Sequence, residues 1–225
     1  MTLWVVTPWA SNNELGASSL DLRTYKMSNE NETESAWDQY YKITAGRPPR
    51  EFLNRTLRRF QAVGLAVDLG CGAGSESIFL LQHGWQVLAI DQQESAIQKL
   101  SASVPPNTMG HLETQVTLFK TINLPPADLI WAGRSLPFCE PEEFNALWHK
   151  ICGALLPNGR FAGDFFGTRH AWAGEIDMTF HTKEQVLALC TELQLEYIIE
   201  EEGEEMTAMN GIQHWHMFTI SALKV

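Results

Sequence analysis

The chain has 225 residues and a formal net charge of -11, with 16 Lys and Arg against 27 Asp and Glu. That length suits one α/β domain with a sizeable core, and the negative average surface disfavours nucleic acid and anionic membranes as partners. No apolar run approaches the roughly 18 residues of a membrane-spanning helix, and the four cysteines show no metal-ligand spacing. We therefore expect a cytoplasmic protein with reduced cysteines, no bound metal and no membrane association.

Residues 1–34 have neither a helical nor a strand period and end in a polar run from Ser28 to Glu34. This composition is typical of a disordered leader. Because Met27 lies directly before the run, an alternative interpretation is that translation starts there. The remainder, residues 35–225, is predicted to form one domain whose first segment, residues 35–60, is a helical cover.

The cover is expected to contain a helix at about Ala36–Ile43 and a second helix from Phe52 to Phe60, both over the edge of the main fold. Strands and helices then alternate. The predicted strands are, in order, 65–69, 86–90, 113–119, 127–132 and 160–166, and the predicted helices between them are 75–83, 94–101 and 142–156. The stretch Pro157-Asn158-Gly159 is expected to stop the last of these helices.

After a helix that begins at the capping box Thr182 to Gln185, the alternation stops. Two strands follow in succession, 195–201 and 214–223, with the acidic stretch Glu200–Glu205 and Asn210-Gly211 as the turn region. The predicted fold is therefore an α/β, Rossmann-like, seven-stranded and mostly parallel sheet. It has a C-terminal antiparallel hairpin and helices on both faces.

The turn after the first strand carries three glycines, in Asp68-Leu69-Gly70-Cys71-Gly72-Ala73-Gly74. Glycines there let main chain approach a ligand at the carboxyl end of the sheet. Asp91 ends the second strand, where its carboxylate is placed to accept hydrogen bonds from both hydroxyls of a ribose. Together the turn and the acid indicate an adenosine-containing ligand, and the G-x-G-x-G spacing favours S-adenosylmethionine over a dinucleotide.

From about Trp37 to Val225 the sequence resembles the class I methyltransferases, especially the branch of the tellurite-resistance methyltransferases and, more distantly, thiopurine methyltransferase. The residues that carry the resemblance are Trp37-Asp38-Gln39-Tyr40-Tyr41, Gly46-Arg47-Pro48-Pro49, the Asp68–Gly74 turn, Asp91, Leu136-Pro137-Phe138, Pro157-Asn158-Gly159-Arg160 and His214-Trp215-His216. The resemblance implies an enzyme that transfers the methyl group of S-adenosylmethionine by in-line displacement. We expect a small-molecule acceptor such as an oxyanion, a thiol or a small metabolite.

The resemblance also implies that the glycine turn lies under the methionine part of the cofactor and that Asp91 holds its ribose. Relatives often place a carboxylate after the third strand for the adenine, whereas this chain has Leu118-Phe119-Lys120-Thr121, so Phe119 is the expected contact. The predicted cofactor-binding residues are Trp37, Tyr41, Arg47, Asp68, Gly70, Cys71, Gly72, Gly74, Asp91, Gln92 and Phe119.

For the acceptor, the segment Gly167–His181 has no period and is expected to be a binding lid, with His170 as the candidate catalytic acid or base. The alternative is a solvated loop with an incidental histidine. Arg47 and Arg134 are candidates for an anionic group, and the alternative for each is an ordinary surface arginine. Asp164 is expected to be a buried, hydrogen-bonded carboxylate.

His214 and His216 share one face of the last strand, and hydrogen-bonded histidines are favoured there over metal ligands. The glutamates at 200–205 are expected to be a solvated hairpin tip. Two other functions stay open at this point. One is a nicotinamide-dependent oxidoreductase, which would need a G-x-G-x-x-G turn, and the other is a non-catalytic S-adenosylmethionine-binding module.

Overall fold

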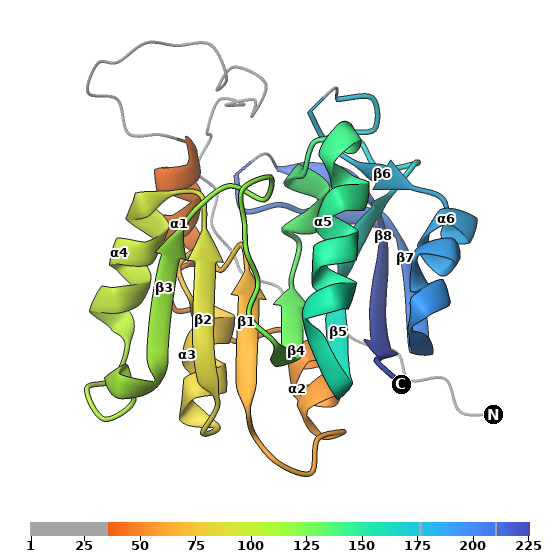
Figure 1. Ribbon diagram of the computed structural model, residues 1–225. Helices are drawn as coiled ribbons and strands as arrows, with labels where there is room; N and C mark the ends of the chain where they lie inside the picture. The colour runs from red at the N-terminus through yellow and green to blue at the C-terminus, as the bar shows by residue number, and fades with distance from the viewer. Residues whose placement is uncertain (1–35, 176, 210) are drawn as a thin grey trace, which may run out of the picture.

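The computed structural model describes residues 36–175, 177–209 and 211–225, and the predicted leader therefore lies outside the described residues. The predicted α/β fold is confirmed (Figure 1). The strands are β1 (Leu65–Leu69), β2 (Gln86–Asp91), β3 (Leu112–Val116), β4 (Ala127–Ala132), β5 (Leu155–Gly167), β6 (Phe180–His181), β7 (Gln194–Met206) and β8 (Ile212–Leu223). The α-helices are α1 (Ala36–Thr44), α2 (Glu51–Leu57), α3 (Ser75–Gln82), α4 (Glu94–Ser103), α5 (Pro141–Ala154) and α6 (Lys183–Leu189).

The strands form one sheet in the order β3-β2-β1-β4-β5-β8-β7. The first five of these strands pair in parallel, whereas β8 pairs antiparallel with both β5 and β7. The two-residue strand β6, which the sequence did not indicate, pairs with the end of β5. Short 3₁₀ turns, Met109–His111 (η2), Leu136–Phe138 (η3) and Cys190–Glu192 (η4), complete the path.

Two apolar layers hold helices against the faces of the sheet. On one face α5 and α6 cover the inward side chains of β1, β4, β5 and β8, and α5 stands in front of the sheet in Figure 1. On the other face α2, α3 and α4 pack over alternate residues of β1, β2 and β4. This alternation follows from the two-residue period of a strand, which sends successive side chains to opposite faces.

Several predicted boundaries need correction. Helix α2 ends at Leu57 and covers a sheet face, because Phe52 packs on Trp131 with ring centroids 5.6 Å apart, and it therefore does not lie at the edge. Helix α5 ends at Ala154, ahead of Pro157, and β5 begins immediately after it. The third strand ends at Val116, which leaves Phe119 in the following loop.

The acidic stretch Glu200–Glu205 is not a hairpin tip. It lies within β7 and pairs with β8 from Phe218 to Gln213. Some of its carboxylates have cationic partners, since Arg169 pairs with Glu200 and Glu202 and Lys183 pairs with Glu200, while His214 contacts Glu202 and Glu204. Paired cations allow a run of like charges to remain in a strand, which the sequence pattern alone does not reveal.

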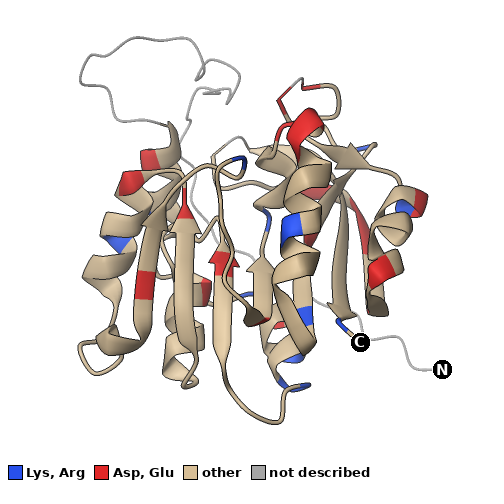
Figure 2. Cartoon of the chain, in the orientation of Figure 1, with Lys and Arg blue, Asp and Glu red and all other residues tan. Residues whose placement is uncertain are grey.

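The cysteines, the helix lengths and the distribution of charge complete the description of the fold. All four cysteines are buried and unpaired. In the described segments no helix has the length and apolar character needed to cross a bilayer. Asp and Glu side chains are distributed over both flanks of the fold and outnumber Lys and Arg (Figure 2).

We expect Phe161→Ala to lower the free energy of unfolding by about 3–5 kcal/mol, the usual cost of deleting a buried ring. Phe161 is fully buried in β5 and packs edge-on against Trp148 of α5, with centroids 4.9 Å apart. Urea unfolding followed by circular dichroism measures the change. Leu187→Ala, at a side chain that is 41% exposed, is the control and should change stability by less than about 0.5 kcal/mol.

Candidate functional site

The site is a cavity of about 240 Å³ at the carboxyl ends of β1, β2 and β4. Its walls come from α1, the glycine turn after β1, the loop after β4, and the turn that joins β7 to β8. All eleven residues that the sequence predicts for cofactor binding line this one cavity, namely Trp37, Tyr41, Arg47, Asp68, Gly70, Cys71, Gly72, Gly74, Asp91, Gln92 and Phe119. Segments that are far apart in the sequence therefore meet where an open parallel sheet places its ligand.

The turn after β1 needs glycine for steric reasons at two positions. Gly70 has a φ of +71°, and a Cβ there would lie 2.4 Å from the Cβ of Ser135. Gly74 has a φ of +88°, and its Cβ would lie 2.3 Å from Leu100. The N–H groups of Gly70 and Cys71 both donate to the carbonyl of Ile90, which joins the turn to the end of β2. The result is a tight cradle of exposed main chain.

Asp91 is the hydrogen-bonding centre of the cavity. Its Oδ2 accepts from the N–H of Gly72 at 2.9 Å, and its Oδ1 accepts from the N–H of Gln93 at 2.9 Å and the hydroxyl of Tyr41 at 3.2 Å. Burial raises the pKa of Asp91, while the two N–H groups and the Tyr41 hydroxyl favour the charged form. A carboxylate held in this way has a fixed orientation toward the cavity.

Helix α1 places aromatic rings over the same carboxylate. Trp37 stacks on Tyr41 with centroids 5.9 Å apart, and it contacts Phe138 edge-on at 5.1 Å. Tyr41 is only 4% exposed, although its helix has few other buried residues. The ion pair between Asp38 and Lys99 joins α1 to α4 at 3.6 Å. The predicted cover is therefore attached to the fold directly beside Asp91.

Asp68 lies on β1 beneath the glycine turn and is 2% exposed. Its Oδ2 accepts from the hydroxyl of Ser77 at 2.6 Å. Burial, together with the charge of Glu76, raises the pKa of Asp68 to about 7. Cys71 is also buried, and burial raises the pKa of its thiol well above the usual range, so the thiol stays protonated.

Two arginines converge on Glu76, which is 3% exposed at the start of α3. Arg47 pairs with both oxygens of Glu76, and Arg50 donates to Oε1 through its side chain at 2.9 Å and its N–H at 3.2 Å. Burial alone would raise the pKa of Glu76, but Arg50 and Arg47 outweigh it and hold the pKa below its usual range. Arg47 is thus neither free nor an ordinary surface residue.

Arg134 follows β4 and also lines the cavity, so it is not the surface arginine that the sequence left open. Its N–H donates to Asp164 at 3.0 Å, and Asp164 also accepts from the hydroxyl of Thr219 at 2.6 Å. Asp164 is thus the buried, hydrogen-bonded carboxylate that was expected. Arg134 has a φ of +59°, and its guanidinium lies over the ring of Trp215 at 4.7 Å.

His170 does not line the cavity. It is 3% exposed, its ring stacks on Phe166 at 4.2 Å, and its Nδ1 accepts from the N–H of Trp172. Burial lowers the pKa of His170 to about 4. The structure thus corrects the picture of an exposed acid or base on a lid, because aromatic packing draws this histidine behind the cavity wall. From the predicted lid, Trp172 lines the cavity.

Other lining residues carried no recognisable signal in the sequence. They include Arg50 and Ser135, and also Met206, Thr207, Ala208 and Met209 from the β7–β8 turn. The hydroxyl of Ser135 donates to the carbonyl of Leu69 and thereby secures the end of β1. The β7–β8 turn reaches the cavity because the two strands of the hairpin, at 13 and 12 residues, are longer than the predicted strands 195–201 and 214–223.

The raised pKa of Asp68 predicts a pH dependence of stability. The carboxyl binds its proton more tightly in the folded state, so the free energy of unfolding falls as pH rises from about 4 to about 7. Asp68→Asn should remove up to about 1.4 kcal/mol per pH unit of that decline, the value for one proton. Urea unfolding at several pH values measures it. Glu113→Gln, at an exposed site, should leave the slope unchanged, and an equal slope in Asp68→Asn would contradict the prediction.

Comparison with known proteins bears on this cavity. Residues 66–159, less than half of the chain, match the family model of a methyltransferase domain, and this stretch contains the glycine turn and Asp91. A segment of 44 residues, 20% of this chain, is 43% identical to ribosomal RNA small subunit methyltransferase C of Alcanivorax borkumensis. That segment spans 14% of the curated relative.

Solved structures share the fold. TehB from Haemophilus influenzae superimposes with a TM-score of 0.68 at 15% identity, over 79% of this chain and 63% of that one. The N-methyltransferase NodS from Bradyrhizobium japonicum, solved with S-adenosylhomocysteine, gives 0.61 at 16% identity, over 84% and 88%. The 1,6-didemethyltoxoflavin N1-methyltransferase of Burkholderia thailandensis gives 0.59 at 16% identity, over 78% and 77%. The family match thus places a methyltransferase domain at residues 66–159, and these solved structures share its fold.

Proposed function

We propose that the protein is an enzyme that transfers the methyl group of S-adenosylmethionine to a small-molecule acceptor. One observation carries the proposal. The carboxylate of Asp91 and the cradle of Gly70 to Gly74 line the same cavity, with the Gly72 N–H bonded to that carboxylate. This is the arrangement that a nucleoside needs, a fixed anion for the ribose beside main chain that a ligand can approach closely.

The residues present fit the cofactor. Asp91 would accept from the ribose hydroxyls, in place of the Tyr41 hydroxyl that now contacts it. The main chain from Gly70 to Gly74 would lie against the methionine part, and a side chain at Gly70 would meet Ser135. Gln92 and Phe119, which lie in the segments after β2 and β3, would flank the adenine. Trp37 and Tyr41 would cover the bound molecule.

When bound, S-adenosylmethionine supplies a methyl group on a positively charged sulfur that leaves as a neutral thioether. The chain's own residues then have two tasks, which are to align the acceptor and to exclude water. The aromatic rings of α1, together with Phe166 and Trp172, supply the apolar walls that exclude water. His170 is buried and neutral, so we assign it the support of these walls in place of proton transfer.

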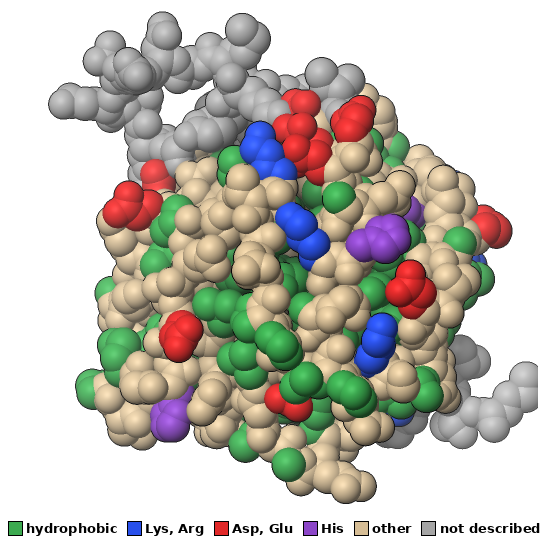
Figure 3. Space-filling model, in the orientation of Figure 1, with side chains coloured by type: hydrophobic (Ala, Val, Ile, Leu, Met, Phe, Trp, Pro, Cys, Tyr) green, Lys and Arg blue, Asp and Glu red, His purple; other side chains and the backbone are tan. Residues whose placement is uncertain are grey.

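The negative net charge of the chain favours a small-molecule acceptor over an RNA acceptor. The chain has a net charge of -11, and on the face shown in Figure 3 the Lys and Arg side chains are few and separate from one another. The identity to a ribosomal RNA methyltransferase covers only 44 residues, which is 20% of this chain. NodS is an N-methyltransferase, and the Burkholderia enzyme was solved with 1,6-didemethyltoxoflavin, which is a small molecule.

We expect Asp91→Ala to weaken S-adenosylhomocysteine binding about 10- to 150-fold. That range corresponds to about 1.5–3 kcal/mol for hydrogen bonds to a charged group. Isothermal titration calorimetry measures the dissociation constant. Asp128→Asn is the matched control, because Asp128 accepts from the Leu65 N–H at the opposite end of β1. An unchanged dissociation constant in a folded Asp91→Ala protein would remove Asp91 from the cofactor site.

Transfer itself is tested with S-adenosylmethionine labelled in its methyl group. The protein is incubated with cell extract that has been divided into a small-molecule fraction and a ribosomal RNA fraction. We expect label in the small-molecule fraction with the wild-type protein and a strongly reduced signal with Asp91→Ala. Label that enters ribosomal RNA would support the competing assignment, and label in neither fraction despite cofactor binding would indicate a module that binds without catalysing.

A further inference from the structure

At one corner of the cavity, three buried nitrogen atoms, two on lining residues and one on a residue behind the wall, lack a hydrogen-bond partner among the described residues. They are Nε of Arg134, Nε1 of Trp215 and Nε2 of His170. The three side chains are neighbours. The Trp215 ring lies 4.7 Å from the Arg134 guanidinium and 4.8 Å from the His170 ring. Buried polar groups in folded proteins are nearly all paired, so such a cluster requires an explanation.

All three atoms are donors. The guanidinium and the indole N–H can only donate. The Nδ1 of His170 accepts from the N–H of Trp172, so the neutral ring carries its proton on Nε2. Burial lowers the pKa of His170 to about 4, which keeps it neutral near pH 7. A corner that offers donors without an acceptor is suited to an anion.

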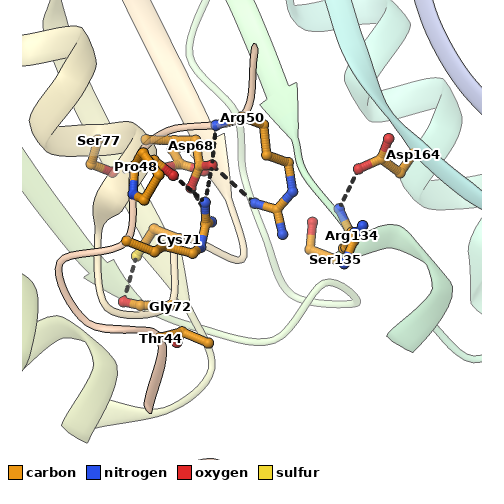
Figure 4. Close-up of polar contacts among 12 residues, drawn as sticks. Thr44, Pro48, Arg50, Asp68, Cys71, Gly72, Ser77, Arg134, Ser135 and Asp164 are labelled. Carbon is orange, nitrogen blue, oxygen red and sulfur yellow. Dashed lines mark hydrogen bonds and ion pairs between the residues drawn. The ribbon is translucent and has the colours of Figure 1, made fainter. Parts of the chain in front are cut away.

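Arg134 has two carboxylates in its wider surroundings, Asp164 and Glu205, but its side chain forms no direct ion pair with a described residue. No carboxylate among the described residues lies within 4 Å of its guanidinium, although its main-chain N–H is bonded to Asp164. Arg50, which is the other nearby cation, shares its charge with Glu76. In Figure 4 Arg134 lies on the Asp164 side and Arg50 on the side of Asp68 and Cys71.

The walls beside Arg134 are aromatic. Phe166, Trp172 and Trp215 line the cavity, and their ring centroids lie 5.4–6.0 Å from one another. Burial of large flat rings around a ligand favours a flat, apolar molecule over a hydrated ion. An inorganic oxyanion would use the charge of Arg134 and leave these walls without a partner, and a cationic acceptor would be repelled.

We propose that this corner is the acceptor subsite and that it takes a flat, conjugated carboxylate, whose anionic group is held by Arg134 and Trp215 against the walls of Phe166 and Trp172. The inference rests on the proposed methyl transfer and names its acceptor class. Arg134 is the binding residue for the carboxylate, and His170 is a positioning residue that acts through Trp215 and Phe166.

The test measures acceptor binding to the protein saturated with S-adenosylhomocysteine. The probes are benzoate, 4-hydroxybenzoate, cinnamate and indole-3-carboxylate, each paired with its neutral carboxamide, and sulfate as an inorganic anion. Calorimetry and quenching of tryptophan fluorescence report binding. We expect at least one carboxylate to bind, its carboxamide to bind at least about 10-fold more weakly, and sulfate not to compete.

Arg134→Gln should weaken binding of the carboxylate by about 10-fold or more. Trp215→Phe keeps a phenyl ring in the wall but removes the indole N–H and part of the ring, and it should weaken binding by a smaller factor. Arg59→Gln is the matched control, because Arg59 lies over the ring of Tyr197 at 5.3 Å and does not line the cavity. Thermal unfolding shows whether each variant folds. If Arg134→Gln is unfolded, Trp215→Phe and Arg134→Lys are compared with the wild-type protein in its place. Wild-type affinity for the carboxylate in both of these variants would overturn the proposal.

The other outcomes are also decisive. Three results would overturn this inference: sulfate binds and no carboxylate does, carboxylates and carboxamides bind equally well, or no probe binds. If S-adenosylhomocysteine still binds in these cases, the cofactor assignment stands. A loss of S-adenosylhomocysteine affinity in Arg134→Gln would reassign Arg134 to the carboxylate of the cofactor and would likewise overturn it. Failure of the wild-type protein to bind S-adenosylhomocysteine would instead refute the proposed function.

Discussion

The site depends on the junction between the ends of β1 and β2. The N–H groups of Gly70 and Cys71 bond to the carbonyl of Ile90, and the N–H of Gly72 bonds to the carboxylate of Asp91. These bonds hold the glycine turn and the acidic side chain in one fixed relation. Any side chain at Gly70 would collide with Ser135, so the turn can keep this path only with glycine.

Around this junction the chain arranges its charges in an ordered way. Glu76 pairs with both Arg47 and Arg50 at the start of α3, while Asp68 lies buried beneath the turn. Arg134 is left as a cation without a carboxylate partner for its side chain among the described residues, and it lies against an aromatic wall. The arginines paired with Glu76 and the unpaired Arg134 can therefore serve different bound molecules.

The loop after β5 and the final hairpin are joined on the outside of that wall. Arg169 donates to Glu202 at 2.8 Å and to Glu200 at 3.1 Å, and the main-chain N–H of Arg169 donates to Nδ1 of His216 at 3.2 Å. Exposed ion pairs of this kind contribute little to stability individually. Here they connect the loop that carries Trp172 with the strand that carries Trp215, and both of these residues line the cavity.

The sequence by itself determined the order of strands and helices, the glycine turn and the role of Asp91 as a cavity residue. These features are local, because buried strands, turn glycines and a residue at a strand end are all visible in short segments. Only the tertiary structure decided that Arg134 lies in the cavity, that His170 lies behind it, and that the β7–β8 turn forms one wall. Those positions depend on contacts between segments far apart in the chain, such as Arg134 on Trp215, and no local pattern encodes such contacts.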